Sequence, residues 1–217
     1  MVTPAALREQ IQVALKDRCQ TAFLTEKKHL SESFPSAAGE IPRGALTEIA
    51  GPGRTSLLYS LLAGMTARQE FCALLDAENS FDPGSAEAAG VKLSQILWVR
   101  CGGNVEHAFK AADMLSQGGG FGMVAIDLGN TSEKIMRRVP LAAWFRLRHG
   151  VEDTRTAMIV VANRIHARSC SALKIELEKQ RTLWRGQLPG GLLNGFEIVV
   201  RSTRNHRVEE SGFLIRR

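Results

Sequence analysis

Few cysteines occur in this chain, and none has the spacing of a metal ligand. Cys19, Cys72, Cys101 and Cys170 form neither a CxxC pair nor a Cys/His zinc spacing, which predicts free thiols in a reducing compartment. Long apolar runs are also missing: no window approaches the roughly 20 apolar residues that span a bilayer, and the N-terminus has no signal-peptide core. These absences argue against a disulfide scaffold, a cysteine-based metal site and a membrane protein. We expect a cytoplasmic protein without a metal centre.

The composition is that of an ordinary globular domain, but its charge is unevenly distributed. Of 217 residues, 44% are hydrophobic and 23% are charged, which suits one compact domain. Residues 1–130 carry 11 Lys and Arg against 14 Asp and Glu, whereas residues 131–217 carry 17 against 8. The basic C-terminal part indicates a polyanion or an acidic protein surface as partner. A solvated basic face without a ligand is the alternative.

The N-terminal segment predicts a helical arm. Leu7, Ile11 and Leu15 recur every four residues, which is typical of an amphipathic helix over residues 2–16. Residues 31–39 are small, polar and contain proline, so they predict a linker. The apolar stripe needs a groove, either on its own domain or on a partner. We therefore expect an arm and linker at 1–39 and a core domain at 40–217.

From Arg43 onward, short apolar runs alternate with helical segments. Strands are predicted over 45–50, 71–75, 96–100, 122–126 and 157–162, and helices over 55–67, 105–115 and 132–149, the last broken at Pro140. The runs are uninterrupted, as in strands covered on both faces. This pattern predicts an α/β fold with a mostly parallel sheet flanked by helices.

The C-terminal segment follows a different pattern. Residues 195–201 and 212–217 resemble strands, with a polar stretch over 203–210 between them. They predict an antiparallel hairpin at the edge of the sheet.

A glycine-containing turn joins the predicted strand over 45–50 to the predicted helix over 55–67, where a phosphate-binding loop would lie. A working loop follows the pattern GxxxxGKS/T, in which backbone N–H groups surround a phosphate and the lysine and hydroxyl bind phosphate and Mg²⁺. Here the glycines are two positions apart, so the loop is about three residues shorter than that pattern, and arginine replaces lysine. We expect no productive hydrolysis of MgATP, no required cofactor and at most weak ATP and magnesium binding; an ordinary tight turn is the alternative. The degenerate loop comprises Gly51, Pro52, Gly53, Arg54, Thr55 and Ser56.

Residues 76–83 read DAENSFDP and resemble the motif that follows the second strand of the bacterial recombinase RecA. Similar stretches in the same order are IAGP at 49–52, MVAID at 123–127 and IVVANRI at 159–165. The resemblance runs, with gaps, from about residue 40 to 200. It implies a RecA-like fold.

The functional residues of RecA are only partly present. Glu78 matches the glutamate that activates the attacking water, and Asp127 matches the carboxylate that helps to hold Mg²⁺. Asp82 matches an aspartate near the adenine, but Ser85 replaces the nearby aromatic residue. Arg164 stands where RecA has the glutamine that senses the γ-phosphate. Because hydrolysis depends on positioning the phosphates first, Glu78 is expected to be vestigial and Asp127 to act as a cap or turn former.

Two further stretches are similar to the ImuA family. They are PRGALTE at 42–48 and GVKLSQILWVR at 90–100. ImuA proteins are RecA-related accessory factors of an inducible mutagenesis cassette. They act with the polymerase-like protein ImuB and a replicative-type polymerase in translesion synthesis. The resemblance implies a non-catalytic protein of the SOS response whose partners are RecA and translesion polymerase components.

Basic side chains of the C-terminal half form the last group of candidates. They would contact DNA phosphates without sequence preference, or an acidic protein face. Trp144 and Phe145 among them are expected in the core or an interface, and residues 174–185 alternatively form a solvated helix. A DNA-dependent ATPase or recombinase and a plain DNA-binding module remain alternative functions. The candidates are Arg137, Arg138, Arg146, Arg148, Arg164, Arg168, Lys174, Arg201, Arg204 and Arg207.

Overall fold

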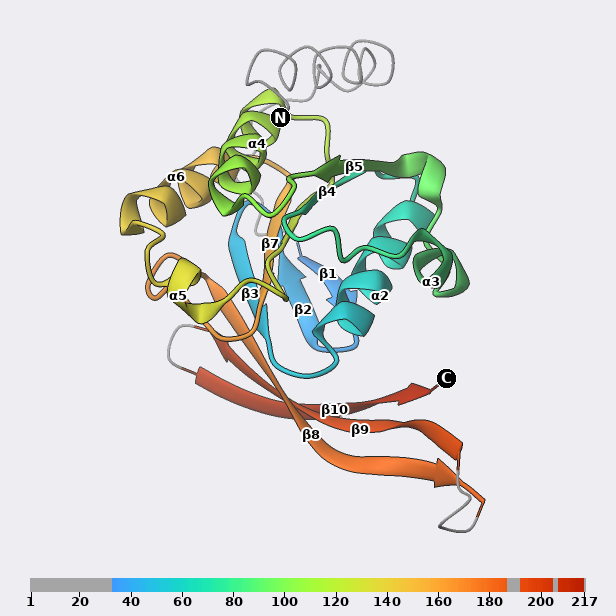
Figure 1. Cartoon of the computed structure of the whole chain (residues 1–217). Coiled ribbons are helices and arrows are strands. Elements are labelled where there is room, and N and C mark those ends of the chain that lie inside the picture. Colours follow the sequence, from blue (N-terminus) through green and yellow to red (C-terminus); the bar gives the residue numbers. More distant parts are fainter. Residues whose placement is uncertain (1–32, 187–191, 205–206, 217) are drawn as a thin grey trace.

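The computed structural model describes residues 33–186, 192–204 and 207–216. Its strands are β1 Ser33–Ser36, β2 Gly39–Pro42, β3 Leu46–Ala50, β4 Cys72–Asp76, β5 Ile96–Arg100, β6 Met123–Asp127, β7 Ala157–Ala162, β8 Leu173–Arg185, β9 Leu192–Arg204 and β10 Arg207–Arg216. Eight of them form one sheet in the order β10-β9-β8-β3-β7-β6-β4-β5, and β1 and β2 form a separate hairpin (Figure 1). The six strands β8, β3, β7, β6, β4 and β5 run parallel to one another. Strand β9 is antiparallel to β8, and β10 is antiparallel to β9. The predicted fold class is confirmed.

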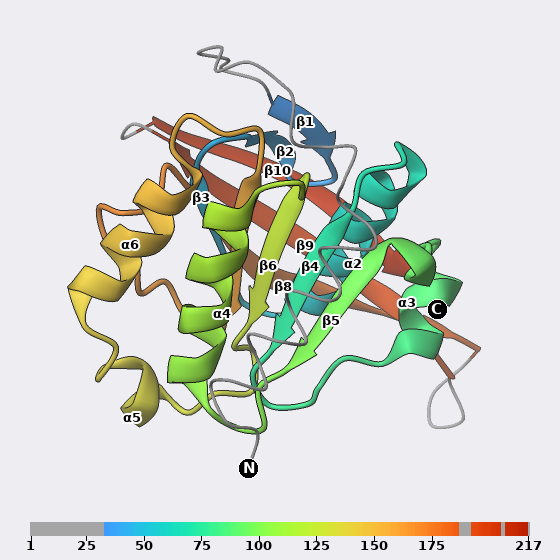
Figure 2. The same ribbon diagram turned by 90° about the horizontal axis from the view of Figure 1, so that it is seen from above.

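Helices cover both faces of the sheet (Figure 2). The helices are α2 Arg54–Ala67, α3 Pro83–Ala88, α4 Val105–Gly118, α5 Glu133–Met136 and α6 Leu141–Val151, with a 3-10 turn at Leu93–Gln95. One core lies between the sheet and α4 with α6, and a second lies between the sheet, α2 and the β1–β2 hairpin. The predicted break at Pro140 is confirmed, because this residue occupies the N-cap position of α6.

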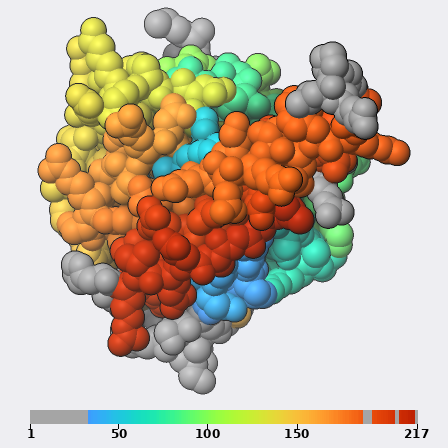
Figure 3. Space-filling model, turned by 90° about the horizontal axis from the view of Figure 1, so that it is seen from below, coloured from blue at the N-terminus to red at the C-terminus, as the bar shows by residue number. Residues whose placement is uncertain are grey.

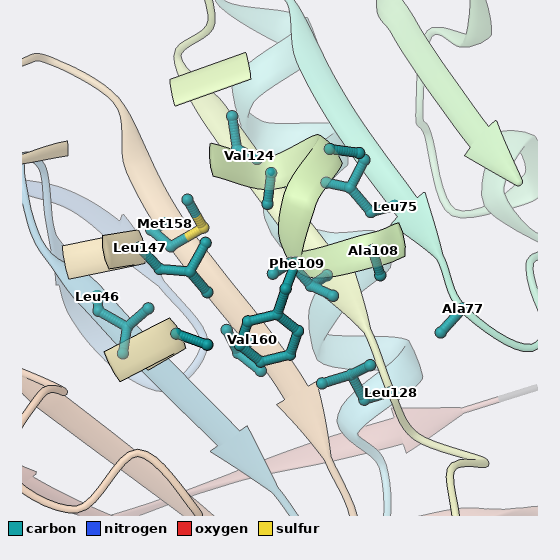
Figure 4. Packing of buried hydrophobic residues seen from close by; sticks show 14 of the residues in the cluster. Leu46, Leu75, Ala77, Ala108, Phe109, Val124, Leu128, Leu147, Met158 and Val160 are labelled. Atoms are coloured by element: carbon teal, nitrogen blue, oxygen red, sulfur yellow. The ribbon is translucent and has the colours of Figure 1, made fainter. Parts of the chain in front are cut away.

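Alternate residues of the central strands enter the two cores. In β4, Ala73 and Leu75 face α4, whereas Cys72 and Leu74 face α2. This arrangement explains why β7 is apolar throughout, and why β4 and β6 are apolar up to their final aspartates. Figure 4 shows the α4 side, where Phe109 and Leu147 contact the sheet.

The two neighbouring aromatics of α6 have different environments. Trp144 is buried and packs edge-to-face on Phe109 with a centroid separation of 5.0 Å. Phe145 is 37% exposed. Trp144 is therefore a core residue as predicted, whereas Phe145 lies on the surface.

Three expectations from the sequence are corrected. The predicted linker over 31–39 is, in its described part, the β1–β2 hairpin, and Phe34 and Ala38 are buried against α2. The alternative of a solvated helix over 174–185 is wrong, because this segment belongs to β8. The predicted antiparallel hairpin at the edge of the sheet is confirmed, but its strands are longer than expected: β9 extends to Arg204 and β10 begins at Arg207, within the polar stretch over 203–210. The predicted arm with Leu7, Ile11 and Leu15 lies outside the described residues.

Strands β8, β9 and β10 curl away from the central sheet. The pairing of β8 with β9 shifts register at Lys179/Arg181 and again at Leu183/Trp184. Irregularities of this kind, such as β-bulges, bend a strand and increase its twist. The three strands pass beneath the start of α2 (Figure 1) and cover much of the face seen in Figure 3. None of the helices in the described part of the chain has both the length and the apolar character needed to cross a membrane.

Candidate functional site

The loop between β3 and α2 is a tight turn packed under the C-terminal strands. Gly51 and Gly53 have φ values of 103° and 86°, in the left-handed region that favours glycine. A side chain at Gly51 would collide with the Leu177 carbonyl oxygen of β8. A Cβ at Gly53 would lie 2.8 Å from Ile215 Cδ1 of β10. The turn is therefore held against β8 and β10.

The Arg54 side chain links this turn to the loop after β6. Its guanidinium donates to the carbonyl oxygens of Gly51 at 3.1 Å and Gly129 at 2.7 Å. Its Nε is buried and has no hydrogen-bond partner among the described residues. Thr55 and Ser56 follow with exposed side chains. Arg54 therefore acts as a bridge between two loops that are 75 positions apart in sequence.

Asp127 ends β6 beside this bridge. Its carboxylate accepts hydrogen bonds from the Gly129 N–H at 2.9 Å and the Ser80 hydroxyl at 3.1 Å. Burial raises the pKa of Asp127, and the neighbouring charge of Asp76 adds to the increase. The expectation of a turn former is confirmed, but Asp127 is not a helix cap, since Ser132 occupies the N-cap position of α5.

Glu78 lies on the loop that follows β4. Its Oε1 accepts a hydrogen bond from the Thr131 hydroxyl at 3.2 Å, which ties it to the loop after β6. The structure thus brings Glu78, Asp127 and Arg54 to the same edge of the sheet. Both carboxylates have protein partners there.

Asp76 organises this loop, and sequence reasoning assigned it no role. The side chain is fully buried. It accepts hydrogen bonds from the backbone N–H groups of Ser80 at 2.8 Å and Phe81 at 3.1 Å, and from Trp98 Nε1 at 3.1 Å. Three donors offset the cost of burying the carboxylate. The conformation of residues 76–81 therefore depends on Asp76.

Asp82 has a local structural role. It occupies the N-cap position of α3 and accepts hydrogen bonds from the Gly84 and Ser85 N–H groups and from the Ser85 hydroxyl. The hydrogen bonds from Ser85 lower the pKa of Asp82. Ser85, which stands where RecA has an aromatic residue, thus completes a helix cap.

Glu48 was also missed, and it positions the segment that follows β7. It is fully buried in β3 and accepts hydrogen bonds from the N–H groups of His166 at 2.6 Å and Ala167 at 3.0 Å and from the Ser171 hydroxyl at 3.3 Å. Burial raises the pKa of Glu48, although these hydrogen bonds oppose the increase. Residues 163–172 therefore run back across the sheet face from the end of β7 to the start of β8.

The structure does not bring the ten basic candidates together. Arg137, Arg138 and Arg164 follow the carboxyl ends of β6 and β7, and Arg164 is exposed there. Arg146 is exposed on α6. Arg201 donates to Glu178 at 3.2 Å and Glu210 at 3.1 Å, so neighbouring strands neutralise it. The other candidates lie at or near the opposite edge, where β3 and β8 begin and β9 ends: Arg148, Arg168, Lys174, Arg204 and Arg207.

Comparison with known proteins identifies the family. Residues 24–132 match the family model of the RecA N-terminal domain. The chain belongs to this RecA family. The match includes the loop at Gly51, the motif beginning at Asp76 and the strand ending at Asp127. The RecA-like nature predicted from these residues is therefore confirmed.

Individual relatives are similar over parts of the chain. RecA of Rickettsia massiliae is 36% identical over 92 residues, which are 41% of this chain and 26% of that protein. RecA of Deinococcus radiodurans is 36% identical over 101 residues, or 45% and 28% of the two chains. RecA of Colwellia psychrerythraea is 26% identical over 196 residues, or 77% and 55%. The chain thus spans between about a quarter and about half of these relatives.

A solved structure supports the same fold. The crystal structure of the RadB recombinase superposes with a TM-score of 0.58 at 14% identity. The alignment covers 81% of this chain and 89% of RadB. At this identity the likeness concerns the fold alone.

Proposed function

We propose that this RecA-family chain is a non-catalytic accessory protein of the DNA-damage response. In this proposal it acts in translesion synthesis and induced mutagenesis by binding RecA or a translesion polymerase complex, as its resemblance to the ImuA family implies. RecA and an ImuB-like protein are the expected partners. No cofactor is required.

The observation that carries the proposal is the arrangement at the β3–α2 turn. A phosphate-binding loop needs several backbone N–H groups directed at one phosphate and a free cation beside it. Here the turn packs against Leu177 and Ile215, and the guanidinium of Arg54 donates to two backbone carbonyls. Hydrolysis requires that the phosphates be held in place first, so the two carboxylates cannot catalyse it without a phosphate-binding loop. Glu78 and Asp127 instead hold neighbouring loops through Thr131 and Gly129.

The first experiment measures phosphate release from MgATP with and without single-stranded DNA. We expect no DNA-stimulated turnover, and the same background for wild type and Glu78→Gln. Turnover that disappears in Glu78→Gln would overturn the proposal and favour a DNA-dependent ATPase of RecA type. The close approach of Glu78, Asp127 and Arg54 is the observation that favours this second function.

The second experiment tests partner binding through the predicted N-terminal helix. Co-sedimentation with RecA filaments on single-stranded DNA is compared for wild type, Leu7→Glu/Ile11→Glu and the charge-matched control Gln10→Glu/Gln12→Glu. The proposal expects loss of co-sedimentation in the first variant and retention in the control, because only the first places charges on the apolar stripe. Equal retention in both variants counts against the arm as the partner element. A steep loss of DNA binding with salt, without RecA binding, would favour a plain DNA-binding module.

A further inference from the structure

A polar pocket lies at the edge of the sheet opposite the Gly51–Arg54 turn. Its volume is about 480 Å³, and it is formed by the start of β3, the end of α6, the segment before β8 and the paired residues Lys174 and Thr203. Serine and threonine hydroxyls and three basic side chains contribute to its wall. The charged lining residues are Arg148, Glu152, Arg168 and Lys174.

The electrostatics of this pocket favour an anion. Three cations come from three separate elements, and the single lining carboxylate, Glu152, is already engaged. Arg148 Nε donates to Glu152 at 2.8 Å, and His149 Nδ1 lies 2.5 Å from its other oxygen. The ion pair orients the Arg148 guanidinium through Nε, which leaves the terminal NH₂ groups, the fork that binds oxyanions, outside that bond.

The backbone that carries these groups is fixed in place. Glu48 holds the preceding residues, and the Cys170 and Ala172 N–H groups donate to Ala167 and Leu46 carbonyls, each at 2.8 Å. Arg168 has a φ of 53°, a left-handed conformation that turns the chain at the pocket. Such a loop presents its side chains without a large ordering cost on binding.

We propose that this pocket binds a phosphate group through Arg148, Arg168 and Lys174, with the hydroxyls of Ser169 and Thr203 as further donors. A phosphate has more oxygens and more charge than a carboxylate, which matches three cations and two hydroxyls in one cavity. The site lies at the other end of the parallel strands from Arg54. It goes beyond the accessory role proposed above, since it depends neither on the N-terminal arm nor on the degenerate loop.

Two probes distinguish the sources of phosphate. Pyrophosphate is titrated by calorimetry, and fluorescein-labelled single-stranded dT20 is titrated by anisotropy at constant salt. The test variant is Arg168→Asn/Lys174→Gln, in which asparagine tolerates the left-handed backbone. The control is Arg68→Asn/Lys92→Gln, which removes the same charge from exposed positions outside the pocket. Thermal unfolding checks that both variants fold.

The proposal expects the test variant to weaken at least one probe by about tenfold or more, because two charge-assisted contacts are lost. The control should change by less than about twofold. A loss confined to dT20 identifies a nucleic-acid phosphate, and a loss that includes pyrophosphate identifies a free phosphate as a ligand; both support the site. Lys174→Arg, which keeps the charge, should retain binding. Failure of wild type to bind either probe, or equal weakening in both double variants, would overturn the proposal.

Discussion

The packing of the C-terminal strands on the β3–α2 turn can be measured with one substitution. Gly51→Ala adds a single methyl group at a residue with φ of 103°, next to the Leu177 carbonyl oxygen. The left-handed backbone alone costs an alanine about 1–3 kcal/mol. The collision involves backbone, so no side-chain rotation relieves it, and overpacking of this kind costs a further ~1–3 kcal/mol.

Gly39 provides a matched control within the same chain. It lies at the β1–β2 turn with φ of 97°, and a Cβ there would have no heavy atom within 4 Å. Gly39→Ala therefore shares the backbone cost and lacks the collision. Gly53→Ala is intermediate, because its close neighbour is the flexible end of Ile215. The order of destabilisation should be Gly51, then Gly53, then Gly39.

Urea denaturation followed by tryptophan fluorescence measures the three free energies of unfolding. Gly51→Ala should be less stable than Gly39→Ala by about 1–3 kcal/mol, and each kcal/mol corresponds to roughly 2–4 °C in Tm for a chain of this size. If Gly51→Ala and Gly39→Ala destabilise equally, β8 does not pack on the turn. The turn would then have room for a triphosphate, and β8 would not close it.

Three further predictions concern ionisable groups. Glu70→Gln should cost about 2–3 kcal/mol in urea denaturation, because it leaves the buried Arg43 without its bidentate carboxylate. Glu106→Gln removes an exposed i,i+4 ion pair with Lys110 and should cost much less, so similar losses in the two variants would contradict this. The pKa of Glu48 is raised in the folded chain, so between its unfolded and its folded pKa this carboxyl is protonated only in the folded chain. The free energy of unfolding therefore falls as the pH rises through that interval. Glu48→Gln should flatten this slope in denaturation series from pH 4 to 7, and an unchanged slope assigns it to other groups. Burial raises the pKa of Cys72 to about 12, so iodoacetamide at pH 8 should leave this thiol unmodified until the chain unfolds, as peptide mass spectrometry can test.

The central sheet was predictable because its signal is local. Residues 123–126 and 157–162 are continuously apolar, which is typical of a strand buried on both faces. Strand β8 also has a local pattern that contradicts the helical alternative. Buried apolar residues alternate with charged ones, since Leu173, Ile175 and Leu177 are buried and the residues between them are charged. Its period of two favours a strand.

The roles of the buried carboxylates were not predictable, because their partners are distant in sequence. Glu48 accepts hydrogen bonds from N–H groups 118 and 119 positions away. Asp76 binds both its own loop and Trp98, 22 positions away. No periodicity or spacing encodes such pairs. The motif that begins at Asp76 was recognised, but which of its acids holds the loop became clear only from the contacts.

The two departures of the β3–α2 turn from a phosphate-binding loop are physically coupled. Shortening the loop removes the N–H groups that would face a phosphate, and it places the Gly51 carbonyl within reach of residue 54. A guanidinium presents donors in several directions, so Arg54 reaches both this carbonyl and that of Gly129, which a single ammonium group does less well. Restoring lysine at position 54 alone would leave the turn packed under Leu177 and Ile215 and would remove the bridge between the two loops. Arginine at this position therefore fits the shortened turn, and a return to nucleotide binding would require a longer loop and displaced C-terminal strands together with the lysine.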